Sequence, residues 1–353
     1  MSLKPILNND KRYVFLLFLC IVTILLCEDA GLFEGINNYC YDTAFRLRGK
    51  RSHADYMIIA AIDEKTLAKL GKWPIRRSCY ADLLDKFEGA AAVGIDIIFS
   101  EASKDDAQLS QAIARQKRVV LPVYIESGFN ISAPVETLSP AGLGHVHLEQ
   151  GIDGIVRQVF HTISYGSVTL PSFSSVLDDV INGRKIIHPL IPPDLTQQKA
   201  AGSIFQSDNM WINFYGAPGT FQYLSVADIL EDRWPAAFFA DKVILVGKTT
   251  PGLNGGILVP FSAGRNSMPA VEVHAHVLNN LLDNSSIQPV KPWIGWALTS
   301  FVAIFCFFVF IRVDSLRATA IGSLILLAIA LITFFIFSNF SIWLFPASFS
   351  LRW

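Results

Sequence analysis

The stretch PWIGWALTSFVAIFCFFVFI, residues 292–311, is followed closely by a second apolar stretch, ATAIGSLILLAIALITFFIF, residues 318–337. Each has about 20 residues, and at about 1.5 Å per residue such a helix crosses a hydrocarbon core of about 30 Å. These two stretches therefore predict two transmembrane helices, and they orient the rest of the chain.

Basic residues beside the apolar stretches predict which side of the membrane each end faces. The linker between the two spans carries Arg312 and Arg317, and basic residues favour the cytoplasmic side. Near the N-terminus, Lys11 and Arg12 precede a third apolar run. We therefore predict a cytoplasmic segment 1–12, a transmembrane helix 13–33, and a domain 34–290 outside the cytoplasm.

The first span has the short apolar core of a signal peptide, but no small-x-small cleavage site follows it. Residues 32–48 then continue with helical spacing of apolar side chains. We therefore expect a retained helix that rises from the membrane and continues as a stalk. At the other end, residues 341–353 are too few to cross a bilayer and predict an incomplete or re-entrant membrane segment.

The composition excludes some classes of protein. The 353 residues are 52% hydrophobic with a formal net charge of −1, so no basic surplus indicates nucleic-acid binding. The five cysteines are too scattered for a disulfide framework. Cys40 and Cys79 are the only pair outside the membrane, and the sequence leaves their pairing open.

The outer segment alternates apolar runs of strand length with helical patterns, which is typical of α/β domains. The predicted strands cover residues 57–62, 91–99, 119–124, 155–165, 211–215 and 243–246. The predicted helices cover residues 64–70, 78–88, 105–116, 172–181, 225–230 and 271–282. Two looser stretches, 127–140 and 182–203, are predicted to be loops or insertions on one compact domain.

Two aspartates follow or interrupt the first apolar strands. Open parallel sheets bind ligands beyond the carboxyl ends of their strands, so Asp63 and Asp96 could converge on one cleft. Asp63 is interpreted first as the cap of the helix that starts at Glu64, with a ligand contact as the alternative. For Asp96, which needs a partner, an ion pair with Arg76 or Arg77 is favoured over a ligand contact.

The stretch GIDGIVR, residues 151–157, resembles a turn that feeds a strand, with Asp153 and Gly154 as the turn. Arg157 suits either a salt bridge or an anion contact. The candidate ligand-binding residues are therefore Asp63, Arg76, Arg77, Asp96, Asp153 and Arg157.

No enzyme signature survives inspection. The stretch Gly247-Lys248-Thr249 mimics the end of a P-loop, but Lys242 stands where that motif needs a glycine. His145 and His147 share a face if they lie on a strand, yet no third metal ligand is evident nearby. We expect no catalytic activity, no metal and no cofactor.

Seven stretches resemble, in order, the second type of CHASE domain, a sensory extracellular domain associated with bacterial cyclases and histidine kinases. They are residues 59–63, 73–76, 94–99, 151–157, 212–216, 243–250 and 269–275, and they cover roughly residues 39–282. The resemblance implies a periplasmic α/β sensor whose signal passes to a cytoplasmic cyclase, kinase or cyclic-dinucleotide domain. Two departures are Ala270 in place of glycine and Asn254-Gly255-Gly256 in place of a more acidic stretch.

The resemblance also implies three spans after the sensor and then an effector, whereas residues 341–353 read only as the opening of a third span. We therefore expect a multi-pass bacterial inner-membrane sensor that signals to an effector in trans. The alternative is a non-switching structural subunit of a larger membrane assembly. Expected partners are membrane lipid, a membrane or periplasmic protein, and further copies in a homo- or hetero-oligomer.

Overall fold

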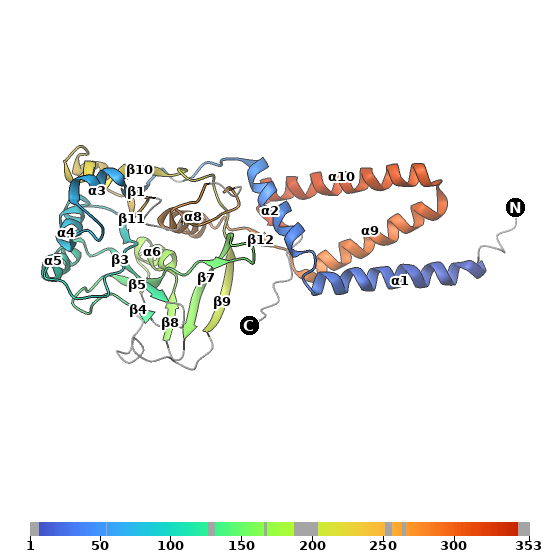
Figure 1. Cartoon of the computed structure of the whole chain (residues 1–353), viewed down its shortest axis with the longest axis horizontal. Helices are drawn as coiled ribbons and strands as arrows, with labels where there is room; N and C mark the ends of the chain where they lie inside the picture. The colour runs from blue at the N-terminus through green and yellow to red at the C-terminus, as the bar shows by residue number, and fades with distance from the viewer. Residues whose placement is uncertain are drawn as a thin grey trace. The chain divides into compact units, whose positions relative to one another are not determined.

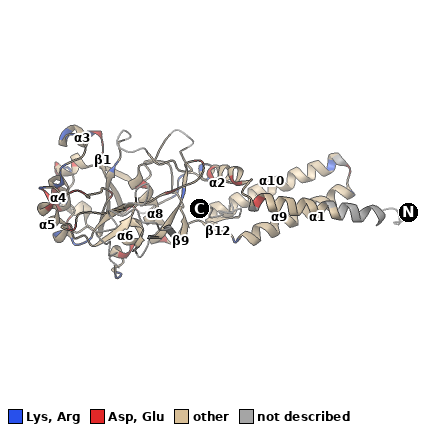
Figure 2. Ribbon diagram, turned by 60° about the horizontal axis from the view of Figure 1, so that its bottom comes forward, with Lys and Arg blue, Asp and Glu red and all other residues tan. Residues whose placement is uncertain are grey.

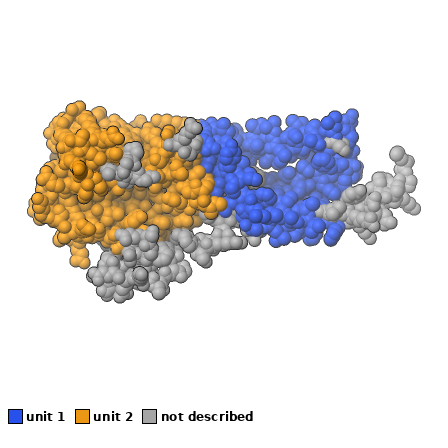
Figure 3. All heavy atoms as spheres, in the orientation of Figure 1, with its two compact units in different colours: residues 1–48, 287–353 blue, residues 49–286 orange. Residues whose placement is uncertain are grey.

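The computed structural model describes residues 7–53, 55–125, 131–165, 168–186, 204–250, 256–262 and 266–344 (Figure 1). The chain divides into two compact units, one of residues 49–286 and one of residues 1–48 together with 287–353 (Figure 3). The first unit carries the mixed α/β fold, and the second carries the apolar helices.

Unit 49–286 is built on a parallel β-sheet with the strand order β10-β1-β11-β2-β3, and β5 pairs with the other edge of β3. The short β4 pairs with β3 in the antiparallel direction. These strands are β1 (Met57–Ile62), β2 (Ala92–Ile95), β3 (Val119–Ile125), β4 (Ile131–Ser132), β5 (Gly142–His145), β10 (Gln222–Ser225) and β11 (Val243–Lys248). Parallel neighbours need crossover connections, and helices supply most of them here.

Helices cover both faces of this sheet. One face packs against α4, α5 and α7 through side chains such as Leu84 and Ile113. The other packs against α6 and α8, which lie side by side, through Phe173 and Val271 (Figure 1). The helices are α3 (Glu64–Leu70), α4 (Arg77–Lys86), α5 (Asp106–Gln116), α6 (Phe173–Ile181), α7 (Val226–Leu230) and α8 (Ala270–Asp283). Burial on both sides explains why a strand such as β1 is apolar at every position.

The helix α8 has no solvent-facing side over most of its length, because ten consecutive residues, 271–280, are buried. Its polar side chains are bonded to neighbouring segments. The carboxylate of Glu272 accepts hydrogen bonds from the backbone N–H of Thr220 at 2.8 Å and from the hydroxyl of Tyr223 at 2.7 Å. These bonds satisfy polar groups that would otherwise be costly to bury.

The predicted strand over residues 211–215 is wrong beyond Trp211, where β9 ends. Further along, the backbone N–H of Asn213 donates to Oδ1 of Asn280 at 2.6 Å, and that of Tyr215 donates to Nδ1 of His276 at 3.2 Å. The sequence pattern predicts a buried strand here because most residues of 211–215 are apolar. The backbone N–H of Ile212 still donates to the carbonyl of Arg157 in β7, but side chains of α8 accept the hydrogen bonds of Asn213 and Tyr215.

A second, antiparallel sheet belongs to the same unit, and its long strand β7 pairs with the other three. Its strands are β6 (Glu149–Gln150), β7 (Val156–Tyr165), β8 (Val168–Pro171) and β9 (Ile204–Trp211). Only Trp211 of the eight-residue β9 falls in a predicted strand, so the prediction misses the rest of β9. The strands β5, β6, β8 and β10 are not predicted by the sequence pattern either. Each has two to four residues, too few for a recognisable alternation.

The other predicted elements agree with the structure to within two residues, except the strand 91–99. There β2 ends at Ile95. The backbone N–H of Asp96 still donates to the carbonyl of Val246 at 2.8 Å, and the residues after it leave the sheet. The predicted loop 127–140 includes β4, and residues 126–130 lie outside the described part. Most of the predicted insertion 182–203 also lies outside it. Cys40 and Cys79 are both free thiols.

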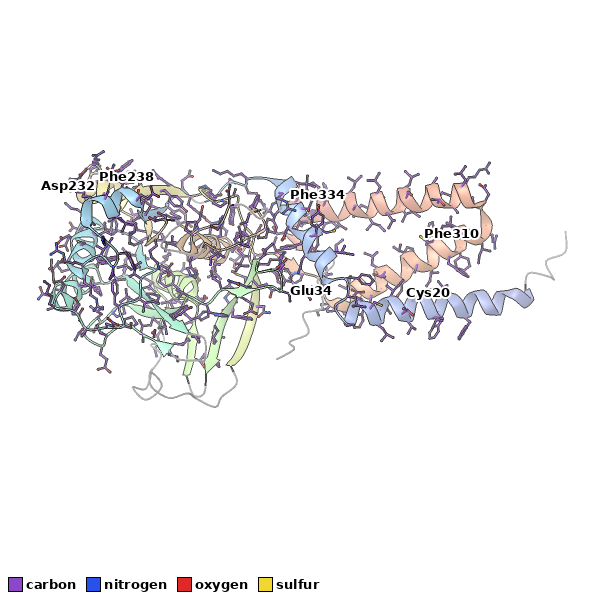
Figure 4. All side chains as sticks on the ribbon, viewed as in Figure 1. Cys20, Glu34, Asp232, Phe238, Phe310 and Phe334 are labelled. Atoms are coloured by element: carbon purple, nitrogen blue, oxygen red, sulfur yellow. The ribbon has the colours of Figure 1, made fainter. Side chains whose placement is uncertain are left out.

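The second unit contains two helices that are long and apolar enough to cross a membrane, over Pro292–Arg312 and Leu316–Phe340. They confirm the two predicted C-terminal spans as candidates. The elements are α1 (Leu7–Asp29), α2 (Glu34–Arg48), α9 (Pro292–Arg312), α10 (Ser315–Phe340), β12 (Gln288–Pro289) and β13 (Ile342–Trp343). The ribbon in Figure 2 has few Lys, Arg, Asp or Glu residues coloured along α9 and α10, and apolar side chains such as Phe310, labelled in Figure 4, are exposed. The apolar part of α1, Leu17–Glu28, is shorter than either span.

The predicted continuous stalk is wrong. The helix α1 ends at Asp29, and the chain turns through Gly31, whose φ of 75° suits glycine, before α2 begins. Aromatic contacts hold α2 within its unit: the ring of Tyr41 lies 5.1 Å from that of Trp343, and the ring of Phe45 lies 4.9 Å from that of Phe337.

The start of the predicted membrane segment 341–353 is not helical. Ser341 has a left-handed φ of 56° and ends α10, and the next two residues form β13, which pairs in parallel with β12. Residues 345–353 lie outside the described part of the chain.

Candidate functional site

A cavity of about 700 Å³ lies where the strands β2, β3, β5 and β11 end, at the carboxyl edge of the parallel sheet. Its walls come from the ends of these strands, from α8 and from the loops beside them. The lining residues are Trp73, Asp96, Ile97, Ile98, Tyr124, Val146, His147, Leu148, Gln150, Lys248, Ile257, Ala270 and His274. This is the edge at which open α/β sheets bind ligands.

The alternation of side chains along β2 directs Asp96 into this cavity. Ile95 and Ile97 pack on the face covered by α4 and α5. Gly94 lies on the opposite face, where an added Cβ would meet the ring of Phe173 at 2.8 Å. Asp96 is two residues beyond Gly94 and shares its side of the sheet, towards α6 and α8.

The carboxyl group of Asp96 is partly buried and accepts no hydrogen bond from any residue in the described part of the chain. Burial raises the pKa of this carboxyl group to about 7, although the positive charge of Lys248 favours its ionised form. Asp96 is therefore a polar group in the wall of a cavity, and none of the described residues donates a hydrogen bond to its carboxyl group.

Lys248 and Trp73 form a second polar feature of the cavity. Lys248 is the last residue of β11, and its Nζ lies 5.2 Å from the centre of the Trp73 indole ring. An ammonium group at this distance is attracted to the face of the ring. The contact holds the cation in the cavity that Asp96 also lines.

His274 brings an imidazole from α8 to the same cavity. The side chain is buried, and its Nε2 has no hydrogen-bond partner among the described residues. Burial lowers the pKa of His274 to about 4, so the ring is neutral near neutral pH. Its edge-to-face contact with Phe173, at 5.5 Å between ring centres, fixes its orientation.

The two histidines considered as metal ligands have other environments. His145 is buried at the end of β5. Its burial, and to a smaller extent the charges of the neighbouring His147, His274 and His161, lower its pKa to about 3. The Nε2 of His147 lies 3.2 Å from a carboxylate oxygen of Glu149. Within the described residues, no group of three or more metal-ligating side chains is close enough to hold an ion.

Asp63 does not line this cavity, and its interpretation as a helix cap is confirmed. Its Oδ1 accepts hydrogen bonds from the backbone N–H of Thr66 at 2.8 Å and from the hydroxyl of the same residue at 2.7 Å. The hydroxyl of Ser225 donates to the same oxygen at 2.9 Å. Asp63 and Asp96 therefore do not converge on one cleft.

The favoured ion pair of Asp96 with Arg76 or Arg77 is wrong. Arg77 is bound to the carboxylate of Asp106 and to the carbonyl of Glu101, on the α4 and α5 face of the sheet. Arg76 precedes α4 and is exposed. The strand alternation places Asp96 on the opposite face, where the nearby cation is Lys248.

Asp153 and Arg157 lie outside the cavity lining and bind each other. The guanidinium of Arg157 donates to both carboxylate oxygens of Asp153, at 3.0 and 2.7 Å. Burial raises the pKa of Asp153, but the hydrogen bond and charge of Arg157 outweigh it and the net pKa is lowered. The salt bridge that closes the turn between β6 and β7 is thus the interpretation that the structure supports, and φ of 74° at Gly154 confirms the turn.

Of the six residues proposed from the sequence, Asp96 is the one that lines the cavity. Sequence reasoning missed Trp73, Lys248 and His274 as its companions. Each lies in a stretch that carried the family resemblance, at residues 73–76, 243–250 and 269–275. The available signal was that these stretches converge in the fold. That convergence can be recognised only when the order of strands in the sheet is known.

A protein-family model described as the CHASE2 domain matches residues 16–313, which is most of the chain and includes all of unit 49–286. No curated protein and no solved structure matches the chain. The family match agrees with the mixed α/β fold and with the sequence resemblance. The chain therefore belongs to the CHASE2 family of extracellular sensory domains.

Proposed function

We propose that this chain is a bacterial inner-membrane sensor that binds a small ligand in the cavity of unit 49–286 and signals to a cytoplasmic effector. Membership of a sensory domain family is the observation that carries the proposal. The two apolar helices α9 and α10 support a multi-pass membrane protein. In this proposal, a partner protein or further copies of the chain receive the signal.

The cavity suits binding better than catalysis. Its described lining residues include no serine, threonine or cysteine that could serve as a nucleophile. They do include two polar groups to which no described residue gives a hydrogen bond, namely the carboxyl group of Asp96 and Nε2 of His274. A ligand that supplies these hydrogen bonds is expected to bind in this cavity.

Signalling requires that the ligand bind one arrangement of the chain more tightly than another, because equal affinity for both shifts no equilibrium. The helix α8 carries His274 in the cavity wall, and β12 and α9 come next in sequence. A change in α8 on ligand binding therefore has a short covalent route to the apolar helices.

Hydrogen exchange of the full chain in lipid nanodiscs tests this function. The probe is the small-molecule fraction of a periplasmic extract. We expect slower amide exchange in β2, β11 and α8 when the extract is present, together with a change in α9 or α10. Protection of the cavity without any change in the apolar helices would instead favour the non-switching structural subunit. No protection anywhere would contradict the sensor.

Thiol labelling tests the proposed location of unit 49–286 in the periplasm. In a background without the native cysteines, Glu88→Cys places a thiol at an exposed position in this unit, and Leu316→Cys places one at an exposed position beside the span linker. We expect an impermeant reagent to label position 88 in intact spheroplasts, and position 316 only after lysis. The basic residues Arg312 and Arg317 motivate this orientation. The opposite labelling pattern would show that the topology is the reverse of the one proposed.

A further inference from the structure

We infer that the second unit carries a binding site for one membrane phospholipid with a zwitterionic head group and ester-linked chains. The site is a cavity of about 580 Å³ whose described lining comes from α1, α2, α9, α10 and the segments beside them. It is separate from the carboxyl-edge cavity, and the proposed sensory function does not depend on it. The inference rests on the proposed location of α9 and α10 in a membrane.

Most of the lining is apolar, and the cavity is open along one side. Leu326 and Phe334 line it from α10, where Figure 4 labels Phe334, and Ile36 and Leu47 line it from α2. Three of these side chains are largely exposed although they line a cavity: Ile36 is 65% exposed, Leu326 66% and Leu47 71%. Contiguous exposed apolar groups of this kind mark a binding surface. The volume falls in the range of about 300–1,000 Å³ that is common for small-molecule sites.

The position of the lining along α10 indicates what surrounds the open side. This part of the lining runs from Leu326 to Phe334, within the apolar helix Leu316–Phe340. Phe334 stands six residues before Phe340, which is about 9 Å of helix from that end. In a membrane, this part of the open side therefore faces hydrocarbon chains rather than water. A lipid acyl chain is the occupant that such surroundings supply.

The hydroxyl of Thr333 is an independent indication that the occupant also carries a polar group. Thr333 lines the cavity and is only 7% exposed, and its Oγ1 has no hydrogen-bond partner among the described residues. A helical threonine can donate to the carbonyl four residues before it, as Thr23 does to Leu19 at 2.8 Å. Because Thr333 makes no such bond, a buried donor faces the cavity, and an acceptor on the ligand would remove the cost.

The side-chain amide of Asn37 supplies a second donor to the same cavity. Its Nδ2 is buried and has no hydrogen-bond partner within the described part of the chain. The carbonyl oxygens of ester groups are acceptors, so they match both the hydroxyl of Thr333 and this amide. A phospholipid carries an ester group on each chain, and the two donors therefore need not meet at one atom of the ligand.

The charges in the lining indicate the head group. The described lining includes acidic side chains, among them Glu34, but no lysine or arginine. Glu34 is the first residue of α2, directly after the turn that follows α1. A head group with a net negative charge would meet a like charge there, whereas an ammonium group would find a carboxylate acceptor. Phosphatidylethanolamine has such an ammonium group, and phosphatidylglycerol does not.

Native mass spectrometry of the full chain tests the lipid. The chain is reconstituted into nanodiscs that contain equal amounts of phosphatidylethanolamine and phosphatidylglycerol with the same chains, and is then released into a mild detergent. We expect one retained lipid per chain, with phosphatidylethanolamine favoured about threefold. A preference for phosphatidylglycerol would overturn the assignment of the head group. No retained lipid, or a lipid-free dimer in which a second copy fills the cavity, would overturn the inference as a whole.

An ether-linked analogue shows whether the ester carbonyl groups are recognised. A diether lipid with the same head group and chains lacks these acceptors, so we expect it to bind about fivefold more weakly. Thr333→Val removes the hydroxyl and should reduce the preference for the ester lipid. Thr319→Val makes the same change at an exposed position of α10 outside the lining and should keep that preference. An undiminished preference in Thr333→Val would show that the hydroxyl does not bind the lipid.

A larger side chain at position 330 tests whether the lipid occupies this cavity. Ala330 lines it, so Ala330→Phe should displace the lipid, while Ala328→Phe adds the same ring at an exposed position of α10 outside the lining and should keep it. Equal retention in the two variants would place the lipid elsewhere. The thiol labelling described above separates the possible failures, because the expected topology without a retained lipid would reject this site and keep the proposed sensor.

Discussion

Two aspartates at the same edge of one sheet have opposite environments. Asp63 comes directly after β1, and its Oδ1 accepts hydrogen bonds from the backbone and hydroxyl of Thr66 and from the hydroxyl of Ser225. Asp96 comes directly after β2, and no described residue donates to its carboxyl group. A position at the end of a parallel strand therefore does not by itself distinguish a residue that caps a helix from one that lines a cavity.

The difference lies in the segment that the chain forms after each strand. The helix α3 starts at Glu64, directly after Asp63, so its unpaired N–H groups take the carboxylate. After β2, the next helix is α5, which starts only at Asp106. No helix starts directly after Asp96, so its carboxyl group does not cap a following helix as Asp63 does.

Loss of the Asp63 carboxylate is expected to have the largest effect on stability. Asp63→Ala removes a helix cap and leaves polar partners unpaired, so we expect a loss of about 2 kcal/mol in the free energy of unfolding. Denaturant titration of the full chain in detergent, followed by tryptophan fluorescence, measures it. Ser225→Ala, which removes one of the three hydrogen bonds, should cost about 1 kcal/mol.

Asp85→Ala is the matched control, because it removes an exposed carboxylate whose ion pair with Arg115 is also exposed. Such pairs contribute about 0–1 kcal/mol. If Asp63→Ala were no more destabilising than this control, the contrast between a capping and a cavity aspartate would fail.

The smallest effect is expected for Asp96→Asn at acid pH, and it should grow with pH. The folded pKa of about 7 lies above the unfolded value of about 3.9, so the wild type loses stability as pH rises between these values. Asparagine does not titrate, and its advantage in thermal midpoint should widen from about pH 4 to about pH 7 and then level off. A pH-independent difference would show that Asp96 is solvated like a surface carboxylate.

Much of the fold could be predicted because long apolar runs and caps are local signals. The runs of β1 and β11 and the aspartate that starts α3 are readable within a few neighbouring residues. The segment after Trp211 is mistaken for a strand because its side chains are apolar. Its hydrogen-bond partners, such as Asn280, lie far along the chain.

The candidate site could be predicted only in part for the same reason. Asp96 is conspicuous as a charge within an apolar run, but its face is decided by the sheet it joins. The pairing of β11 with β2 brings Lys248 to the cavity, and no short-range pattern reveals that pairing. Local reasoning favours the nearby arginines as partners, and tertiary structure directs Arg77 to Asp106 instead.

The complete burial of residues 271–280 in α8 has a consequence for how this chain tolerates change. In a saturation-mutagenesis map of an ordinary surface helix, the positions that tolerate substitution recur with the helical period along its solvent-exposed face. Here such a period should be absent, and these positions should not tolerate charge, apart from position 272, where hydrogen bonds already hold the carboxylate of Glu272.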